Sequence, residues 1–273
     1  MILLLILFLF VVFQLILCCC ENPRRDIIDY FFISSLTPFP PMAPNPVTFI
    51  SSEDLYQQLI SNHDQFYDSL YDYDWKARKV SSLDQYRDYI RQSVSTSFTQ
   101  DEMEKLRMCA KQCDDFLLTV NIPGFDNIKA SNIPWKIGKV QGRLYEYGLP
   151  HTRHHDLIVL SDVENLKDDV RTLTRTLIHE KIHIYQKQNM DEVQKYLEIN
   201  QFEKYKRREY NDLIRANPDL DGWIYRDRMS GKIYKCEYKS NNPENIIDVK
   251  NTDQLEEHPF EKMAVNIAQK FLY

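Results

Sequence analysis

The sequence is poor in glycine and, beyond residue 20, poor in cysteine. Only six glycines occur in 273 residues, and they form neither a Gly-rich phosphate-binding loop nor a dinucleotide-binding fingerprint. Beyond residue 20 the only cysteines are Cys109, Cys113 and Cys236, and three thiols cannot all pair within one chain. These shortages exclude nucleotide-binding folds built on such loops, and they exclude a disulfide scaffold. Cys109 and Cys113 lie one helical turn apart, so we expect both to be buried thiols.

The chain also lacks an excess of positive charge. Its net charge is −6 at pH 7, whereas a nucleic-acid-binding protein normally presents a basic face, so we expect no nucleic-acid partner. No Asn-x-Ser/Thr acceptor for glycosylation occurs, which favours a domain not built for secretion. The length of 273 residues suits one ample domain or a domain with a helical annex.

The one long hydrophobic run lies at the start of the chain. Met1–Cys20 contains a single polar side chain, Gln14, and approaches the roughly 20 apolar residues that span a bilayer. No basic residue precedes this run, and Arg24 and Arg25 follow it. The charge asymmetry favours a single-pass membrane anchor, with the rest of the chain on the cytoplasmic side. The alternative is a signal peptide that is cleaved before secretion.

Two further regions precede the part of the chain that carries the chemistry. Residues 21–50 are expected to form a linker, because six prolines fall between residues 21 and 47 with no helical period between them. Residues 51–120 are expected to form a helical annex, because Ser82 and Thr99 each begin a capping-box pattern. The Tyr- and Asp-rich loops of this annex either shape a substrate groove or form a solvated surface.

Residues 121–273 are expected to form a mixed α and β domain. A loop-rich start leads to a short β-type run and then to a helix that begins near Asp168 and ends at Gln188. Further on, Asn217-Pro218 ends a charged helix, and a Ser-Gly turn joins two strands. The expected strands are Trp135–Val140, Arg143–Tyr147, Leu157–Leu160, Gly222–Tyr225 and Lys232–Tyr238, and the other expected helices are Asp191–Ala216 and one that opens at Pro259.

The helix that ends at Gln188 contains the run His-Glu-Lys-Ile-His from His179 to His183. At about 100° per residue, His183 lies about 40° round the helix from His179 and one turn along, so both imidazoles can reach one metal ion. Glu180 lies on the flank of this pair, where its carboxylate suits a general base beside a two-histidine metal site. Two histidines on the polar face of a helix can also be simply solvated. A metal site therefore requires a third ligand.

The best candidate for the third ligand is Glu261. The last helix opens with Pro259 at the favoured first position, and its apolar residues recur at helical spacing, so one face is buried. Glu261 falls at the edge of that apolar stripe, where a half-buried carboxylate would carry a desolvation penalty without a cation. Glu257 and His258 are alternative ligands. The interpretation without a metal is an acid that is stabilised by the N-terminus of the helix.

The stretch from Leu177 to Gln186 resembles the active-site helix of the zincin metallopeptidases. In that superfamily the two histidines bind zinc and the glutamate between them activates water, roles that the resemblance assigns to His179, His183 and Glu180. The pattern His-Pro-Phe-Glu-x-x-Ala around Glu261 resembles the gluzincin arrangement, in which a downstream glutamate completes the zinc site.

Two residues depart from the zincin pattern. Zincins favour uncharged residues between the two histidines, whereas Lys181 falls in the apolar arc of the helix and must extend to solvent or find a carboxylate partner. Val265 stands where an aspartate often follows the gluzincin ligand. The resemblance covers residues 150–273, and the chain also loosely resembles the uncharacterised zincin-like proteins of large DNA viruses.

The resemblance implies further roles around the active-site cleft. In zincins a strand before the metal helix borders the cleft and pairs with extended substrate backbone, which places Leu157–Leu160 in that role. Hydrolysis of a peptide bond also requires a hydrogen-bond donor for the oxyanion that forms on the substrate carbonyl group. The candidate donors are Tyr225, Tyr234, Tyr238 and the loop histidines His151, His154 and His155. These loop histidines are better explained as polar loop residues than as a second metal site.

The sequence therefore predicts a membrane-anchored zinc metallopeptidase with an α+β, zincin-like (gluzincin-type) fold. Zn²⁺ would be held by His179, His183 and Glu261, with Glu180 as the catalytic base and a peptide or protein as the substrate. The alternative is a catalytically silent zincin-fold protein with a structural or binding role at a membrane. The intact Glu180 favours the enzyme, because a purely structural metal site has no use for a base beside it.

Overall fold

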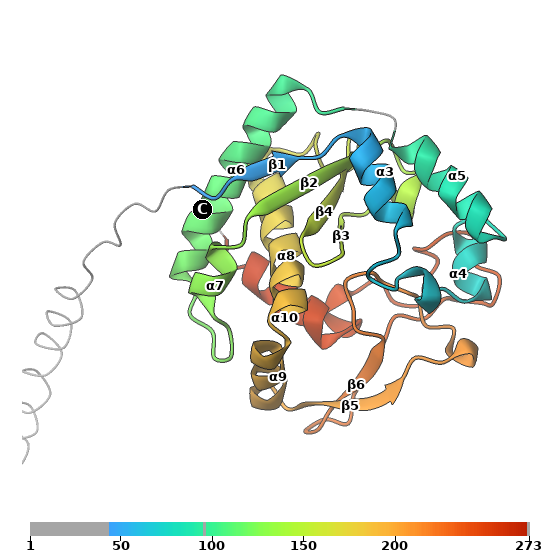
Figure 1. The fold of residues 1–273 in the computed structure, drawn as a ribbon. Coiled ribbons are helices and arrows are strands. Elements are labelled where there is room, and N and C mark those ends of the chain that lie inside the picture. Colours follow the sequence, from blue (N-terminus) through green and yellow to red (C-terminus); the bar gives the residue numbers. More distant parts are fainter. Residues whose placement is uncertain (1–43, 95–96, 272–273) are drawn as a thin grey trace, which may run out of the picture. The chain divides into compact units, whose positions relative to one another are not determined.

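The structure, a computed structural model, describes residues 44–94 and 97–271, which belong to one compact unit (Figure 1). The predicted membrane segment, residues 1–20, and most of the predicted linker, residues 21–43, lie outside the described residues. Within the described part of the chain, no helix is both long and apolar enough to cross a bilayer. This part is a mixed α and β fold with two small sheets, which agrees with the predicted α+β class.

A four-stranded sheet lies at the centre of the fold. β1, β2 and β4 run parallel, and β3 pairs antiparallel with β4 as an edge strand. The predicted strands at Trp135 and Leu157 are confirmed, whereas β1 falls in the range predicted as a linker, so the linker prediction was wrong for those residues. The strands, in spatial order, are β1 (Val47–Phe49), β2 (Trp135–Val140), β4 (Leu157–Ser161) and β3 (His151–Arg153).

Helices cover both faces of this sheet. β4 is buried at every position, because its alternate side chains enter two different cores. Ile158 and Leu160 join the core on one face, and Leu157 and Val159 join the core on the other. The first face is covered by α6 (Gln100–Thr119), α8 (Val170–Gln188) and α10 (Pro259–Ala268), and the second by α3 (Ser52–Ile60) and α5 (Leu83–Ser93). Shorter elements are η1 (Tyr67–Ser69), α4 (Asp72–Ala77), α7 (Asn127–Ser131), η3 (Tyr210–Asp212) and η4 (Gln254–Glu256).

The two helix starts predicted from capping patterns are confirmed. At the start of α6 the Thr99 hydroxyl accepts the Glu102 N–H, and the Glu102 carboxylate accepts the Thr99 N–H, which completes a capping box. At the start of α5 the Ser82 hydroxyl accepts the Gln85 N–H, but the Gln85 side chain accepts from Ser81 instead. The local sequence therefore fixes where both helices begin.

A buried ion pair joins α6 to α8. Lys181 is 1% exposed, pairs with Asp114 of α6 and donates to the Ser131 carbonyl at 3.2 Å. Of the two outcomes predicted for Lys181, extension to solvent or a carboxylate partner, the structure shows the second. Cys109 and Cys113 of α6 are buried free thiols, as predicted.

A second, three-stranded sheet replaces most of a predicted helix. α9 (Met190–Ile199) ends early because Gln201 takes a left-handed conformation, with φ of 62°, and the following backbone pairs with a strand. The predicted helix Asp191–Ala216 is therefore wrong beyond α9. The hairpin predicted around Gly231 is confirmed. The strands of this antiparallel sheet are β5 (Phe202–Arg207), β6 (Trp223–Asp227) and β7 (Ile233–Tyr234).

The predicted strand Arg143–Tyr147 is also wrong, because this segment forms the turn η2 (Tyr145–Gly148). Glu146 has a left-handed φ of 45°, which no strand contains. Tertiary contacts hold this conformation: the Glu146 carboxylate accepts from Arg78 Nε at 2.8 Å, and its N–H donates to the Tyr89 hydroxyl at 3.0 Å. A pattern of neighbouring residues could not reveal partners that lie so far away in the chain.

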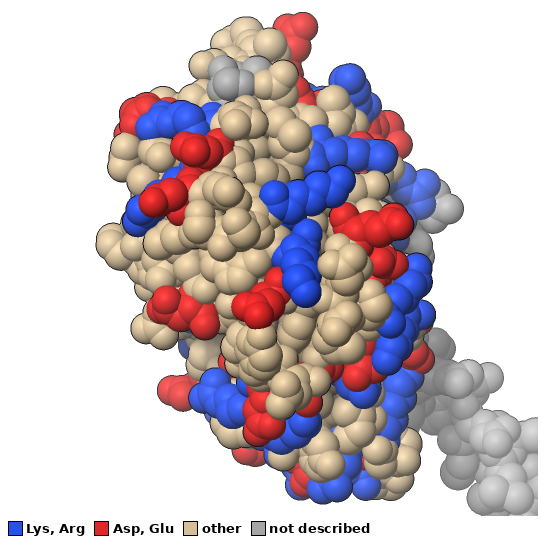
Figure 2. All heavy atoms as spheres, turned by 90° about the vertical axis from the view of Figure 1, so that its right-hand side faces the viewer, with Lys and Arg blue, Asp and Glu red and all other residues tan. Residues whose placement is uncertain are grey.

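The surface carries charges of both signs. On the face shown in Figure 2, Lys and Arg side chains are interspersed with Asp and Glu side chains rather than gathered in one area. Exposed ion pairs such as Lys111 with Asp115 contribute little to stability. The buried charged groups are therefore the ones that shape the molecule and its cavity.

Candidate metal centre

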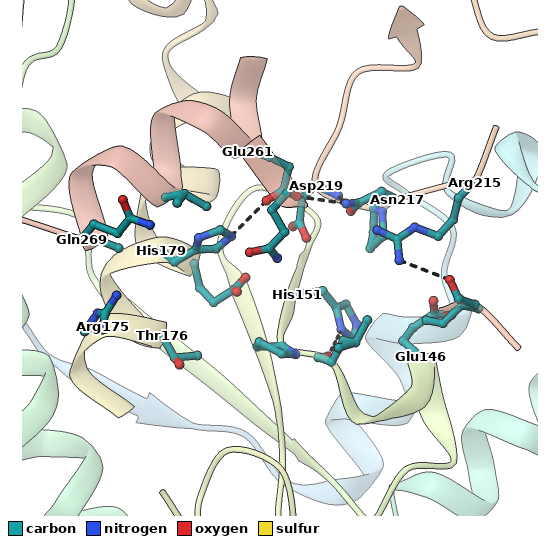
Figure 3. Close-up of a pocket in the computed structure, with 18 of the residues that line it drawn as sticks. Glu146, His151, Arg175, Thr176, His179, Arg215, Asn217, Asp219, Glu261 and Gln269 are labelled. Carbon is teal, nitrogen blue, oxygen red and sulfur yellow. Dashed lines mark hydrogen bonds and ion pairs between the residues drawn. The ribbon is translucent and has the colours of Figure 1, made fainter. Parts of the chain in front are cut away.

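A cavity of about 350 Å³ lies between α8 and α10 (Figure 3). The lining residues of α8 are Thr172, Arg175, Thr176, His179 and Glu180, which form one stripe of the helix because they recur at i, i+3, i+4, i+7 and i+8. The lining residues of α10 are Glu261, Val265 and Ala268, and Gln269, which caps the end of this helix, lines the cavity as well. The other walls come from η2, from β3 and from the loop before β6, which contributes residues 215–219.

The first turn of α10 positions Glu261. His258 caps the helix by accepting a backbone N–H through Nδ1 at 3.1 Å, and Pro259 occupies the first helical position, as predicted. Ala264 is fully buried in the core shared with α8, and its small side chain lets the two helices approach closely. Glu261 is consequently only 3% exposed and faces the histidines of α8.

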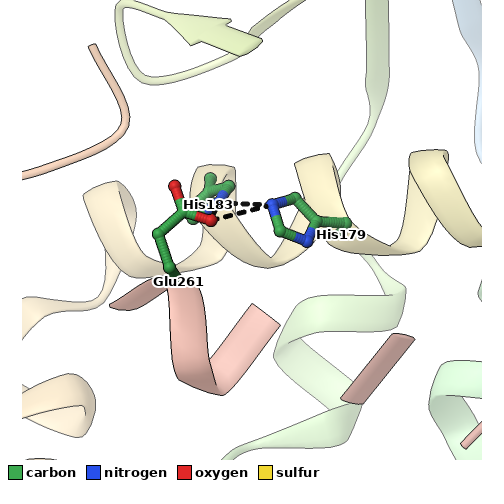
Figure 4. Close-up of side chains that lie close together, drawn as sticks. All are labelled: His179, His183 and Glu261. Carbon is green, nitrogen blue, oxygen red and sulfur yellow. Dashed lines mark hydrogen bonds and ion pairs between the residues drawn. The ribbon is translucent and has the colours of Figure 1, made fainter. Parts of the chain in front are cut away.

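The structure brings the three predicted ligands together. One ligand atom from each of His179, His183 and Glu261 lies within 4.8 Å of the others (Figure 4). Glu261 Oε2 is 3.2 Å from His179 Nε2 and 3.6 Å from His183 Nε2, and the two Nε2 atoms are 3.0 Å apart. Two imidazole nitrogens and a carboxylate oxygen form a donor set that suits zinc.

Gln186 fixes the orientation of His183. The Gln186 amide nitrogen donates to the Phe260 carbonyl at 3.0 Å, so the amide oxygen faces His183 Nδ1, which is 2.8 Å away. Because an amide oxygen only accepts, Nδ1 of His183 carries a proton, and Nε2, which faces Glu261, is the nitrogen that can bind a metal ion once it is deprotonated. Metal-binding histidines are commonly oriented in this way by an outer hydrogen-bond partner.

The charges of the cluster fit a cation. Burial lowers the pKa of His183, but the carboxylates of Glu261 and Asp219 outweigh burial and raise this pKa to about 10. Burial raises the pKa of Glu261, but the two imidazoles hold it well below its usual range. Among the described residues, the buried Oε2 of Glu261 has no hydrogen-bond partner. The cluster therefore attracts positive charge, and a divalent cation would satisfy all three ligand atoms at once.

Glu180 lies beside this cluster and lines the cavity. It is 1% exposed, and within residues 44–94 and 97–271 its Oε2 has no hydrogen-bond partner. Burial, and then the nearby carboxylate of Asp219, raise the pKa of Glu180 well above its usual range. A carboxyl group with a raised pKa holds a proton more readily than an ordinary carboxylate does, which suits a group that must accept a proton during catalysis.

Asp219 and Lys187 occupy the outer edge of β3. The Thr152 N–H donates to Asp219 Oδ1 at 2.8 Å, and the Thr152 carbonyl accepts from Lys187 Nζ at 3.0 Å. Asp219 and Lys187 also lie 3.7 Å from each other. The backbone groups of Thr152 that point away from β4 are therefore already hydrogen-bonded.

The role implied for Leu157–Leu160, pairing with substrate, is wrong. This segment is β4, which has β2 on one side and β3 on the other, so its backbone has no free edge. The edge belongs to β3. There Pro150 has no N–H, and the N–H of His154 donates to Asp64 at 3.1 Å.

The alternative ligands lie outside the cluster. Glu257 accepts from Arg215 at 2.8 and 2.9 Å, and His258 Nε2 lies 3.3 Å from Asp221. Neither residue lines the cavity. Glu261 is therefore the candidate that the fold places beside the two histidines.

Most candidates for the oxyanion donor lie away from the cavity. Tyr225 and Tyr238 donate their hydroxyl protons to aspartates at 2.8 and 3.1 Å, and Tyr234 packs against a lysine of α10. His154 Nε2 contacts a backbone carbonyl of α3 at 2.8 Å, and His155 does not line the cavity. Among the described residues, the group with metal-ligand geometry is the one around Glu261, and none of the loop histidines belongs to it.

His151 is the candidate that does line the cavity. Its Nδ1 lies 3.0 Å from the Leu149 carbonyl, so the neutral ring carries its proton there and presents the lone pair of Nε2. Burial lowers the pKa of His151, which favours this neutral ring. His151 is thus suited to accept a hydrogen bond from a ligand rather than to stabilise an oxyanion.

Four residues around the cavity were not found from the sequence. They are Arg175, Gln186, Asn217 and Asp219. Gln186 follows His183 by three residues on one helix, a spacing that could have identified it. Asn217, which donates to Glu261 Oε1 at 3.0 Å, lies with Asp219 in a loop without a pattern, so no local signal could have linked them to the helix.

Comparisons with known proteins do not assign this chain to a family. No family model, no curated protein and no solved structure matches the chain. What the site does must therefore be inferred from its own side chains, their charges and the cavity beside them.

Proposed function

We propose that this protein is a zinc-dependent peptide hydrolase in which His179, His183 and Glu261 hold the metal. The observation that carries the proposal is the convergence of two imidazole nitrogens and one carboxylate oxygen. Two further observations support it: Glu180 lies beside the three ligands with a raised pKa, and both Glu180 and His179 line a cavity that can receive a substrate.

The donor set favours zinc over harder cations. Imidazole nitrogens suit zinc, whereas calcium and magnesium prefer oxygen ligands. Three protein ligands, rather than four, are typical of catalytic zinc sites, because one position stays open for water or substrate. The resemblance of the His179 helix to the active-site helix of zincins points to the same metal.

In the proposed reaction, different residues would perform different steps or hold the ligands in place. Bound zinc would supply a Lewis acid that lowers the pKa of water and polarises a carbonyl group. Glu180 would accept a proton from the attacking water and later pass it to the leaving amine, and its raised pKa fits both steps. Asn217 would keep Glu261 in place through their 3.0 Å hydrogen bond, and Gln186 would keep His183 in its metal-binding tautomer.

The proposal includes a peptide or protein substrate and a membrane tether. The apolar run at residues 1–20, followed by Arg24 and Arg25, supports a single-pass anchor with the cavity on the cytoplasmic side. Secretion after cleavage of this run is the alternative. Protease protection of the C-terminal region in intact vesicles distinguishes the two arrangements.

The test compares the full-length wild type with Glu180→Gln, both purified in detergent. We expect one zinc ion per chain in each, and cleavage of a mixed peptide library, read by mass spectrometry, at least about 100-fold slower in the variant. Zinc in both proteins with equal cleavage would remove the enzyme and leave a catalytically silent zinc-binding protein. Absence of zinc from both would remove the metal site itself.

A further inference from the structure

We infer that the cavity recognises a carboxylate of the substrate through Arg175, and that the substrate does not add a strand to the edge of β3. This inference deepens the proposed function and rests on it for the identity of the substrate as a peptide. The contacts that carry it are those of the cavity wall and do not depend on catalysis.

The edge of β3 offers no free backbone N–H to a substrate strand. Both outward groups of Thr152 are used, its N–H by Asp219 and its carbonyl by Lys187. A substrate strand would have to displace these contacts and leave a buried aspartate without its hydrogen bonds, which is unfavourable. The neighbouring outward positions add no N–H donor, because Pro150 has none and that of His154 donates to Asp64. A substrate strand could not complete its hydrogen bonds at this edge, which favours recognition by side chains that line the cavity.

Arg175 is the charged side chain of the cavity without a counter-charge. It lines the cavity, and within residues 44–94 and 97–271 it has no ion pair, hydrogen bond or ring contact. The other charged residues of the lining, apart from the metal cluster and Glu180, are all balanced. These balanced pairs are Glu146 with Arg78, Arg215 with Glu257, and Asp219 with Lys187.

The distance along α8 from Arg175 to His179 is close to the length of one or two residues of an extended peptide. It precedes His179 by four residues on the lining stripe of α8, and four residues advance a helix by about 6 Å. Figure 3 shows Arg175 at one end of the cavity, on the side where Gln269, the residue after α10, lies. Each residue of an extended peptide spans about 3.5 Å. A carboxylate at Arg175 would thus lie one or two residues from a substrate carbonyl at the metal cluster.

The chemistry of Arg175 favours an anionic group over other ligands. A guanidinium group binds a carboxylate through two parallel hydrogen bonds, and such a ligand would supply the charge that the cavity wall lacks. A substrate with a cationic group there would meet a like charge. The carboxylate is either the free C-terminus of a peptide or the side chain of an Asp or Glu near the cleaved bond.

The experiment measures binding in the full-length, zinc-loaded Glu180→Gln protein, which holds peptides without cleaving them. Calorimetry compares acetyl-Ala-Phe-Ala-Ala with its C-terminal amide, and an amidated peptide carrying Asp at the last position with its Asn counterpart. We expect at least one acid to bind about 10- to 100-fold more tightly than its neutral partner. The pair that shows the difference identifies the source of the carboxylate.

Two further substitutions, each made in the Glu180→Gln protein, test whether the preference for the acidic peptide depends on Arg175. Arg175→Gln should abolish it, whereas Arg228→Gln, which removes the same charge from an exposed turn outside the cavity, should retain it. Equal affinity within both peptide pairs, absence of measurable binding, or a preference that survives Arg175→Gln would each overturn the inference. Cleavage by the wild type is a separate readout: an Arg175-dependent preference without cleavage removes the hydrolase and leaves the binding site.

Discussion

Two clusters of buried charges lie on opposite sides of α8, and they differ in how completely their groups are paired. Toward α6, Lys181 pairs with Asp114, whose other oxygen accepts from Trp135 Nε1 at 3.1 Å and from Asn45 at 2.8 Å. Toward α10, the cluster of His179, His183 and Glu261 borders a cavity. Among the described residues, the Oε2 atoms of Glu180 and Glu261 have no hydrogen-bond partner on that side.

This difference in pairing distinguishes a network that stabilises the fold from a site that binds a ligand. A buried polar network whose members are all satisfied holds the elements around it in one arrangement. A buried carboxyl oxygen without a hydrogen-bond partner is unfavourable by itself, and such an atom is explained where a ligand supplies the missing partner. Both sides of one helix thus bury charged groups, with opposite consequences.

The largest effect is expected from breaking the complete network. Lys181→Ala leaves Asp114 buried without its counter-charge, and loss of one member of a buried ion pair costs about 3–5 kcal/mol. The free energy of unfolding of the zinc-free protein, measured by denaturant titration, should fall by that amount. The double variant Lys181→Met with Asp114→Asn should recover most of the loss, because it removes both charges. A single variant as stable as the wild type would contradict this description of the network.

A smaller effect is expected at the residue that orients a ligand. Gln186→Ala removes the acceptor of the His183 Nδ1 proton, and loss of such an outer partner weakens metal binding about 10- to 100-fold. Competition with a zinc-binding dye measures this change. Gln188→Ala is the matched control, because Gln188 is exposed near the end of the same helix and should leave the zinc affinity unaltered. Equal loss in both variants would point to general damage of α8 instead.

The smallest effect is expected from replacing the buried carboxyl of Glu180, which has an oxygen without a hydrogen-bond partner. Glu180→Gln replaces a buried carboxyl that lacks a partner by a neutral amide of the same shape, so the zinc-free protein should gain about 0.5–2 kcal/mol in the free energy of unfolding. The exposed substitution Glu244→Gln should change stability by less than about 0.5 kcal/mol. A loss of stability in Glu180→Gln would show that the carboxyl is a structural group.

The sequence could predict those parts of the fold that depend on neighbouring residues. Thr99 and Glu102 lie three residues apart and fix the start of α6 by themselves, and the edge of an apolar helical stripe identified Glu261. Lys181 in an apolar arc had to extend to solvent or find a carboxylate, and the sequence could not say which of the two or which carboxylate. In each case the physical constraint acts within a few residues of the chain.

Partners far apart in the chain decided the remaining parts. Glu146 adopts its left-handed turn because Arg78 and Tyr89 hold it, and neither is visible from residues 143–147. β5 forms where a helix was predicted because β6 lies beside it. Asp219, which occupies the edge of β3, reaches the cavity from a loop that has no pattern of its own.

The most direct test of the account is the zinc content of the purified full-length protein, measured by mass spectrometry after dialysis against trace-metal-free buffer. The wild type should retain one zinc ion per chain, and Glu261→Gln, which keeps the shape of the ligand but removes its charge, should lose it. The variant Glu257→Gln, four residues earlier in the chain and outside the cluster, should retain the ion. A wild type without zinc, or a Glu261→Gln protein that binds zinc as tightly as the wild type, would contradict the assignment of the metal centre.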